Sequence, residues 1–302
     1  MSNHSDSRLK DIFLPPTEEN IALAKVIIIG VPTDEGIRRN GGRVGAAQAP
    51  DAIRKQLDKL TPMATHGSIA DLKVVDFGNV RGSTLEEMHN VARNAVSSFI
   101  ESGKIIIALG GGHDITYPLV KGFVQGLGGT AISLLNIDAH LDVREKKNGL
   151  HHSGSSFRLL IKEGIVQGKN FAEFGIQSFC YSSNDLSWLK SQGSSVYDFD
   201  DLSGVDPSSE VEKLLSSQLP QYVSFDIDSI RSSDAPGSSA PSPIGLTSED
   251  AVNIFYDAGL HRGTQMVDIV EVNPLFDIDN RTAKLAARMI AMFLLGVSRR
   301  AH

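Results

Sequence analysis

Short, uninterrupted runs of apolar residues recur along the chain, separated by segments long enough for a helix. The first run, KVIIIGV at residues 25–31, is rich in β-branched side chains and shows no apolar and polar alternation. Such a run is typical of a strand covered on both faces, as in a parallel sheet. We therefore expect strands near 25–31, 74–77, 105–109, 131–135, 171–174, 195–199, 222–225 and 266–270, with helices near 84–101, 117–124, 208–217, 247–259 and 280–297.

Strands that alternate with helix-length segments define the fold class. Parallel strands joined in this way need right-handed crossovers, which place helices on both faces of one twisted sheet. We predict an α/β fold with three layers, αβα, around a mostly parallel sheet of about eight strands. Residues 1–20 are polar and contain proline, so we expect an N-terminal arm there, and residues 21–302 are expected to form a single domain.

Charge and cysteine content limit the partners of the chain. A net charge of −7 and a sequence pI near 5.7 argue against a broad surface for nucleic acid or anionic membrane, so a small-molecule substrate is expected. The single cysteine, Cys180, cannot form an internal disulfide and fits a reducing compartment. The first residues lack the basic and apolar parts of a signal peptide, and we expect a cytoplasmic protein. The sequence leaves open whether the chain forms a homo-oligomer.

Acidic and histidine side chains follow four of the expected strands. In the segment NIDAHLD at 136–142, two aspartates and a histidine stand at alternate positions, which point to the same side of an extended chain. Ligands of open parallel sheets bind at the carboxyl ends of the strands, so the side chains that follow these strands should meet at one rim. They are His113, Asp138, His140, Asp142, Asp226, Asp228 and Glu271.

So many carboxylates at one rim need compensating cations. Oxygen donors with imidazole suit a divalent ion such as manganese better than a metal that prefers thiolates. One octahedral ion does not need four carboxylates, whereas two ions about 3.5 Å apart use bridging carboxylates and generate hydroxide at neutral pH. We therefore predict two metal ions. The alternative is a solvated, Asp-rich turn or a set of separate helix caps, and it requires each group to find its own partner at the same edge.

Four segments carry a resemblance to a known family. They are GGGHD at 110–114, NIDAHLD at 136–142, SFDID at 224–228 and DIVEVNP at 268–274. These segments resemble the signature segments of the ureohydrolase superfamily, which holds arginase, agmatinase and formimidoylglutamase. The resemblance covers roughly residues 24–298 and implies an arginase-like αβα fold with two Mn²⁺ ions per chain.

The resemblance also implies the ligands and the chemistry. The expected ligands of one ion are His113, Asp138, Asp142 and Asp226, and those of the other are Asp138, His140, Asp226 and Asp228. Asp138 and Asp226 are thus expected to bridge the ions. A hydroxide between the ions is expected to attack an amidine or guanidine carbon, and Glu271 is expected to pair with the cationic nitrogens of the substrate.

Arginines in the loop after the first strand bear on the choice of substrate. The segments RRNGGRVGA at 38–46 and PGSSAP at 236–241 resemble formimidoylglutamases more than arginases. N-formimino-L-glutamate carries two carboxylates, which guanidinium groups bind well, whereas the cationic agmatine would be repelled. We expect Arg38, Arg39 and Arg43 to bind the substrate, with Arg43 favoured. A solvated turn explains Arg38 or Arg39 singly almost as well.

One departure from the arginase pattern concerns the proton donor. Arginase has a histidine immediately before the glycine that matches Gly154, and this chain has Ser153 there. His152 is therefore our candidate general acid, because the unperturbed pKa of histidine lies near neutrality. A histidine in a surface loop is an equal alternative. With Glu271 and Asp142, His152 completes the set of candidate catalytic residues.

Taken together, these patterns predict a binuclear-manganese hydrolase of a linear amidine. The expected reaction converts N-formimino-L-glutamate and water to L-glutamate and formamide, a step of histidine degradation. The main alternative is a guanidine hydrolase that releases urea from arginine, agmatine or a guanidino acid. A non-catalytic relative is less favoured, because all six expected metal ligands are present.

Overall fold

Eight parallel strands form one sheet through the centre of the molecule. The computed structural model describes residues 7–65, 67–215 and 218–300. The order across the sheet is β4-β1-β5-β10-β9-β6-β7-β8, and each neighbouring pair is parallel. This confirms the predicted fold class. The strands are β1 (Val26–Val31), β4 (Val74–Asn79), β5 (Ile105–Gly110), β6 (Ser133–Ile137), β7 (Phe171–Ile176), β8 (Ser195–Asp198), β9 (Gln221–Asp226) and β10 (Thr264–Val270).

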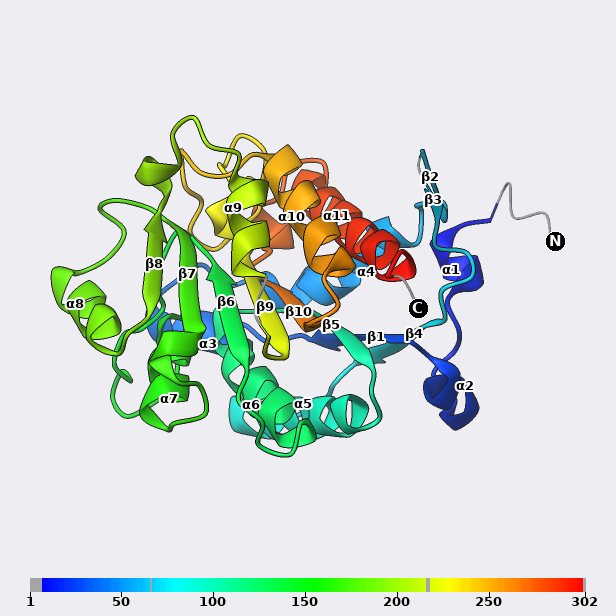
Figure 1. Cartoon of the computed structure of the whole chain (residues 1–302), viewed down its shortest axis with the longest axis horizontal. Helices are drawn as coiled ribbons and strands as arrows, with labels where there is room; N and C mark the ends of the chain where they lie inside the picture. The colour runs from blue at the N-terminus through cyan, green and yellow to red at the C-terminus, as the bar shows by residue number, and fades with distance from the viewer. Residues whose placement is uncertain (1–6, 66, 216–217, 301–302) are drawn as a thin grey trace.

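Helices cover both faces of this sheet (Figure 1). The helices on one face are α4 (Ala49–Leu57), α9 (Pro207–Leu214), α10 (Ser248–Leu260) and α11 (Arg281–Ser298). Those on the other face are α5 (Leu85–Glu101), α6 (Thr116–Gly126) and α7 (Ser156–Lys162). The molecule therefore has the three layers that the alternation of strands and helices predicts.

Successive side chains of the central strands enter two different hydrophobic cores. In β1, Val26 and Ile28 pack in the core under α4 and α11, whereas Ile27 and Ile29 pack in the core under α5 and α6. Side chains alternate between the faces of a strand, so a strand buried on both faces needs apolar residues at every position. This is the physical reason for the unbroken apolar runs in the sequence.

Several short elements were not predicted. They are α3 (Glu35–Asn40), α4, α7, α8 (Ser183–Ser191) and the antiparallel pair β2 (Met63–Ala64) and β3 (Gly67–Ser68). Elements of two to nine residues give too few turns or alternations for a periodic signal. The helix expected at 208–217 ends at Leu214, and residues 216 and 217 lie outside the described residues. Across the described ranges, no helix is both long and apolar enough to cross a bilayer.

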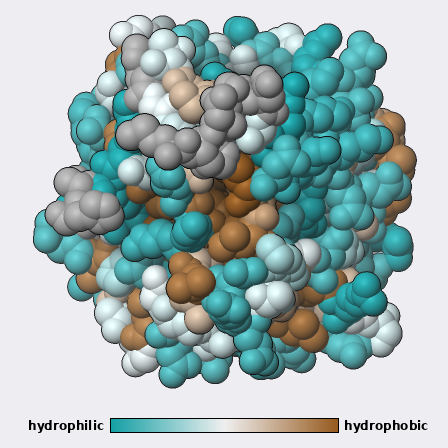
Figure 2. Space-filling model, turned by 90° about the vertical axis from the view of Figure 1, so that its right-hand side faces the viewer, coloured by the Kyte–Doolittle hydropathy of each residue, from teal (hydrophilic) through white to brown (hydrophobic). Residues whose placement is uncertain are grey.

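Part of the segment that we expected to be a polar arm packs against the domain, whereas residues 15–19 are exposed. Helix α1 (Leu9–Ile12) buries Leu9 completely, the backbone of Leu14 pairs with that of Val75, and α2 (Glu18–Leu23) follows. A four-residue helix is too short to be recognised from its pattern. Figure 2 views this end of the molecule, where hydrophilic side chains surround a small apolar area. Residues 1–6 lie outside the described residues, and a domain boundary at residue 20 stays a prediction.

Helices α10 and α11 approach each other so closely that each carries a glycine at the contact. A Cβ atom on Gly296 would stand 2.4 Å from the carbonyl oxygen of Tyr256, and one on Gly259 would stand 2.3 Å from that of Phe293. Both obstacles are backbone atoms, which cannot rotate away. The two glycines therefore fix the spacing of these helices above the sheet.

This contact predicts the effect of a small substitution. Alanine normally stabilises a helix interior relative to glycine, but Gly296→Ala should destabilise the protein by about 1 to 3 kcal/mol because the helices must move apart. Urea denaturation of the purified variants measures this change. In the control, Gly263→Ala, the three atoms nearest the new methyl group belong to the side chain of His261, which can rotate away, so stability should change less than in Gly296→Ala. A Gly296→Ala protein as stable as the parent would show that the helices are not in contact there.

Candidate metal centre

Four adjacent strands deliver the predicted ligands to one edge of the sheet. His113 follows β5, Glu271 follows β10, Asp226 ends β9, and Asp138 follows β6. These strands lie side by side in the order β5-β10-β9-β6. Because parallel neighbours end at the same edge, residues more than a hundred positions apart in the sequence come into contact there.

The first cluster gathers around the imidazole of His113. Its Nδ1 atom lies 3.2 Å from Asp138 Oδ2, 3.1 Å from Asp142 Oδ2 and 3.3 Å from Asp226 Oδ2. The side chains of His113 and Asp138 are fully buried, and that of Asp142 is 10% exposed. These four residues have one ligand atom each within reach of a single ion. They are the four residues that we expected around one metal.

The second cluster shares Asp138 with the first. His140 Nδ1 lies 3.4 Å from Asp138 Oδ1 and 3.4 Å from Asp228 Oδ2. The two oxygens of Asp138 thus face different clusters, as a bridging ligand requires. Asp226 groups only with the first cluster, and its Oδ1 accepts a hydrogen bond from the backbone N–H of Asp228 at 2.9 Å. A bridging role for Asp226 stays a prediction.

Burial and close contact shift the pKa values of the carboxylates and imidazoles in both clusters. Burial, helped by the neighbouring carboxylates, raises the pKa of Asp226 well above its usual range, and burial raises the pKa of Asp228 to about 6. Burial disfavours the charged form of His113, but the surrounding carboxylates raise its pKa well above the ordinary value. The carboxylate of Asp228 likewise raises the pKa of His140. Without metal, bound protons neutralise the carboxylates. Divalent cations would neutralise them better, because carboxylates and imidazoles can ligate a metal together.

Hydrogen bonds behind His113 fix which ring nitrogen faces the carboxylates. Ser224 donates its hydroxyl hydrogen to Asp268 Oδ1 at 2.7 Å, so its oxygen accepts from His113 Nε2 at 3.0 Å. Asp268 also accepts hydrogen bonds from Tyr222 at 2.6 Å and from Thr116 at 2.8 Å. With its hydrogen on Nε2, the ring points the Nδ1 lone pair at the carboxylates, and Nδ1 has no hydrogen-bond partner. This arrangement fits a metal ion between the ring and the carboxylates.

Glu271 stands beside the clusters without belonging to either. Its carboxylate accepts a hydrogen bond from the backbone N–H of His113 at 2.7 Å, and the residue is 5% exposed. Burial raises the pKa of Glu271 to about 8, and a cation brought into the cavity would lower it again. Its backbone is left-handed, with φ 63°, which is uncommon for glutamate. The hydrogen bond from His113 holds the Glu271 carboxylate beside the clusters, and its pairing with a cationic substrate group stays a prediction.

A cavity of about 80 Å³ opens over the metal ligands and Glu271. Arg144, Asn40 and Ser153 line it as well. Arg144 was not predicted; it is exposed, its guanidinium donates to Asn40 Oδ1 at 3.2 Å, and no carboxylate of the described residues pairs with it. The sequence could have indicated Arg144, because position 144 continues the series of alternate positions 138, 140 and 142 that carries the expected metal ligands. The cavity thus joins metal ligands, one carboxylate and one available guanidinium.

None of the three arginines that we expected to bind substrate lines this cavity. Arg39 pairs with Glu35 at 3.2 Å and with Glu86 at 2.8 Å, and Arg38 pairs with Glu35 at 2.5 Å. Both lie in α3, one turn from Glu35, which the sequence spacing alone could have indicated. Their guanidinium groups already have carboxylate partners within the chain.

Arg43 is occupied by the backbone of a neighbouring loop. Its guanidinium donates to the carbonyl oxygens of Ser238 at 2.8 Å and Ser239 at 3.1 Å, and it stacks over the ring of Phe276 at 4.2 Å. The loop at 236–241 lines the cavity through Ser239 and Ala240. Arg43 therefore holds the wall of the cavity, and substrate binding by Arg38, Arg39 and Arg43 stays an untested prediction.

His152 lies next to the cavity but is turned away from it. The residue is 2% exposed, its Nδ1 accepts from the backbone N–H of Gly154 at 3.2 Å, and its Nε2 donates to the carbonyl oxygen of Glu145 at 2.9 Å. Ser153, not His152, lines the cavity. To deliver a proton to substrate, His152 would have to leave Glu145, so its role as general acid stays a prediction.

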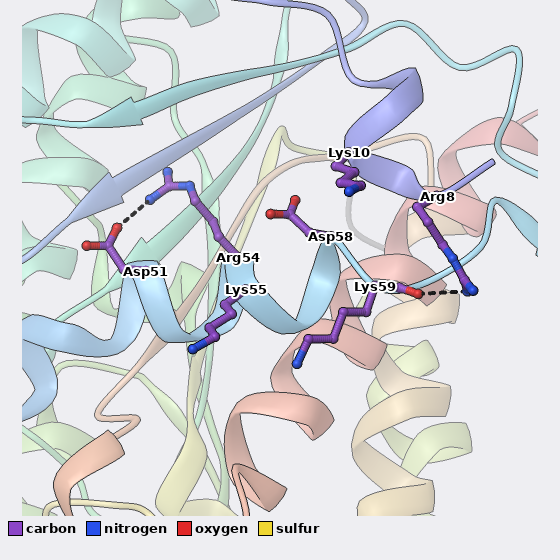
Figure 3. Close-up of a pocket in the computed structure, with 7 residues that line it drawn as sticks. All are labelled: Arg8, Lys10, Asp51, Arg54, Lys55, Asp58 and Lys59. Carbon is purple, nitrogen blue, oxygen red and sulfur yellow. Dashed lines mark hydrogen bonds and ion pairs between the residues drawn. The ribbon is translucent and has the colours of Figure 1, made fainter.

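A larger hollow elsewhere lacks comparable chemistry. It has a volume of about 600 Å³ and is lined by Arg8, Lys10, Asp51, Arg54, Lys55, Asp58 and Lys59 (Figure 3). Arg54 is bound to Asp76 at 2.8 Å, and Arg8 donates to the carbonyl oxygen of Lys59 at 3.1 Å. Within the part of the chain that the structure describes, only the two clusters at the sheet edge group enough ligands for a metal. The candidate metal ligands therefore lie at the smaller cavity and not in this hollow.

Comparison with known proteins agrees with this geometry. The model of the arginase family matches residues 24–296. A formimidoylglutamase from Salmonella newport is 30% identical over 269 residues, which cover 88% of this chain and 83% of that protein. The crystal structure of Trypanosoma cruzi formiminoglutamase with Mn²⁺ has a TM-score of 0.91 and 32% identity, and the match covers 98% of this chain and 100% of that one.

A further relative shows how far the fold alone reaches. The proclavaminate amidino hydrolase from Streptomyces clavuligerus has a TM-score of 0.81 at 24% identity, over 92% of this chain and 93% of that one. The same architecture is thus found in a protein named for a different substrate. The fold alone does not determine the substrate, so the residues that line the cavity must determine it.

The two clusters predict how mutations divide the metals. The purified protein should bind two Mn²⁺ ions per chain. Asp228→Asn should weaken one ion, because Asp228 belongs to one cluster, whereas Asp138→Asn should weaken both, because Asp138 belongs to both. Metal content after dialysis against graded chelator, measured by emission spectroscopy, distinguishes the variants. A parent stoichiometry of one or zero would contradict a binuclear centre.

Proposed function

Because the chain belongs to the arginase family, we propose that it hydrolyses N-formimino-L-glutamate to L-glutamate and formamide with a binuclear manganese centre. One observation carries the choice of substrate. The cavity places a carboxylate, Glu271, and an unpaired guanidinium, Arg144, beside the same metal ligands. An amidine that also bears carboxylates presents the opposite charges. The named activity of the Salmonella relative supports the same substrate.

The donor set fits two Mn²⁺ ions. His113, Asp138, Asp142 and Asp226 would hold one ion, and Asp138, His140 and Asp228 would hold the other, with Asp226 proposed as a second bridge. When bound, such a pair of ions would supply a hydroxide near neutral pH and would stabilise negative charge on the oxygen that attacks the carbon. The proposed reaction adds water across the bond between the formimino carbon and the glutamate nitrogen: the carbon takes the oxygen and leaves as formamide, and the nitrogen takes a proton and remains on glutamate.

Glu271 orients the reacting group. A protonated formimino group is a planar cation with N–H donors, and a carboxylate that accepts from them forms charge-assisted hydrogen bonds. The backbone N–H of His113 holds Glu271 in position through its own hydrogen bond. Since His113 is itself a metal ligand, the carboxylate and the metal centre are fixed relative to each other. This connection places the amidine carbon against the centre without reorganisation.

Arg144 selects the rest of the substrate. The residue lines the cavity, and its hydrogen bond to Asn40 leaves other donors of the guanidinium unused. A carboxylate of glutamate matches this planar fork. An agmatine-like substrate would instead bring an additional cation close to Arg144 and be repelled. A guanidino acid would still fit, and guanidine hydrolysis therefore remains the second candidate. Location in the cytoplasm and a role in histidine degradation belong to the same proposal.

The identity of the products tests the proposed function. The Mn²⁺-loaded protein should release formamide from N-formimino-L-glutamate and should release little urea from arginine, agmatine or guanidino acids. Glu271→Gln is the matched control with reduced activity. It should lower kcat/KM by roughly 30-fold or more, because the cationic group of the substrate then loses its pairing with a carboxylate. Its metal content should equal that of the parent. Urea release with no formamide release would replace the proposal with the guanidine reaction.

A second mutation tests the recognition of the carboxylate. Arg144→Met keeps most of the aliphatic stem and removes the fork, so KM for N-formimino-L-glutamate should rise by about 10- to 100-fold with kcat much less affected. Formamidine, which has no carboxylate, should be hydrolysed equally by parent and variant. Arg43→Met is the comparison: it should lower thermal stability through the lost contacts to Ser238 and Ser239. If Arg43→Met raises KM and Arg144→Met does not, the arginine loop binds the substrate after all.

A further inference from the structure

We propose that Phe179 is a specificity-determining residue of this reaction, whose ring packs against the methylene chain of the substrate. The proposal rests on the proposed function and deepens it. Phe179 lies in the turn that follows β7, outside every segment that the sequence patterns singled out. Four observations support the role: an adjoining cavity, the exposure of the ring, the strain of its backbone, and the anchoring of its turn to the metal loop.

A second cavity adjoins the metal centre and has most of the room. It is about 450 Å³, against about 80 Å³ for the cavity over the metal ligands. His140, Asp142 and Arg144 line both cavities. The remaining wall of the larger one includes residues 179–182 and Asp185. A substrate that binds at the metal centre and reaches past Arg144 enters the cavity that Phe179 lines.

The ring of Phe179 packs with nothing else in the described chain. The residue is 104% exposed and belongs to neither hydrophobic core. A neighbouring acidic group does not prevent a dicarboxylate from entering, because Asp185 already accepts from Arg158 at 2.8 Å and from Ser182 at 2.7 Å. The apolar ring and the cation of Arg144 thus offer complementary contacts to a short aliphatic chain that ends in a carboxylate.

The backbone of Phe179 is strained in a way that folding does not require. Six non-glycine residues of the described chain have positive φ, and four of them are aspartate or asparagine, which tolerate this region. The other two are Glu271, at φ 63°, and Phe179, at φ 70°. Both lie at this site. Strained residues of unsuitable type persist mainly where function needs the side chain, and asparagine or glycine would serve the turn alone better.

Hydrogen bonds tie the turn to the loop that carries two metal ligands. The backbone N–H of Gln177 donates to the carbonyl oxygen of Ala139 at 3.0 Å, between Asp138 and His140 in the sequence. The side chain of Gln177 donates to the carbonyl oxygen of Ile244 at 2.9 Å, and the N–H of Cys180 closes the turn on Gln177 at 3.1 Å. The turn that carries Phe179 is thereby fixed relative to the loop that carries Asp138 and His140.

Two variants separate a role in specificity from a role in folding. Phe179→Ala and Phe179→Asn should both raise KM for N-formimino-L-glutamate by about 5- to 20-fold, with kcat and Mn²⁺ content within twofold of the parent. KM for formamidine, which has no chain to pack, should not change. Phe179→Asn should also raise Tm by about 2 °C, because asparagine tolerates the left-handed backbone. A merely structural phenylalanine would lose stability on both substitutions.

The controls decide between the alternatives. Met63→Ala removes another exposed apolar side chain, from β2, and should leave KM unchanged. Parent-like KM in both Phe179 variants overturns the proposal, and so does a change of molecular mass in light scattering with unchanged KM, which would make Phe179 a contact between copies. If the parent releases only urea from a guanidino acid, the proposed function fails. The KM comparison between that guanidino acid and guanidine then decides the role of Phe179.

Discussion

The structure depends on the concentration of negative charge that four strands bring to one edge of the sheet. Asp138, Asp142, Asp226 and Asp228 form two clusters with His113 and His140, and the ligand atoms of each cluster lie within 4.8 Å of one another in a mostly buried region. Such a cluster costs folding free energy unless cations occupy it. The residues around the clusters hold the ligands together in spite of this cost. The strands are buried on both faces, and Asp268 and its hydroxyl partners hold His113 from behind, so the ligands cannot spread apart to relieve their repulsion.

Two periodicities account for what the sequence could predict. Unbroken apolar runs indicated strands covered on both faces, and carboxylates at every second position after a strand indicated a shared metal. Both signals are local, so they can be recognised without knowledge of the fold. Short helices such as α3 and α8 escaped because they span too few turns. The arginines show a different limit. Charge made Arg38, Arg39 and Arg43 attractive substrate ligands, but the partners that occupy Arg39 and Arg43 include Glu86 and Ser238, which only the tertiary structure brings near. Arg144 occupies the next alternate position after the expected metal ligands at 138, 140 and 142, but no role was predicted for it from the sequence.

The site also shows how a common fold acquires a particular substrate. The metal ligands sit at strand ends, where the sheet fixes them, whereas Arg144 and Phe179 sit in loops that can change without disturbing the sheet. Reaction type and substrate choice are thus assigned to different parts of the molecule. Glu271 belongs to the first group by position, at the end of β10, and its strained backbone is supported by the bond from His113. Hydrogen bonds from Gln177 tie the turn of Phe179 to the metal loop, but the ring belongs to neither hydrophobic core and is free to contact a substrate.

The place of β10 in the sheet sets the order in which the chain can become active. It is the last strand in the sequence, yet it lies in the middle, between β5 and β9. Before it inserts, the sheet consists of two separate halves: β4, β1 and β5 on one side, and β9, β6, β7 and β8 on the other. His113 belongs to the first half and the aspartates of the centre to the second, so without β10 the sheet does not bring His113 to Asp138, Asp142 and Asp226. The complete centre therefore requires β10, and a protein truncated before β10 loses the strand that joins His113 to the aspartates across the sheet.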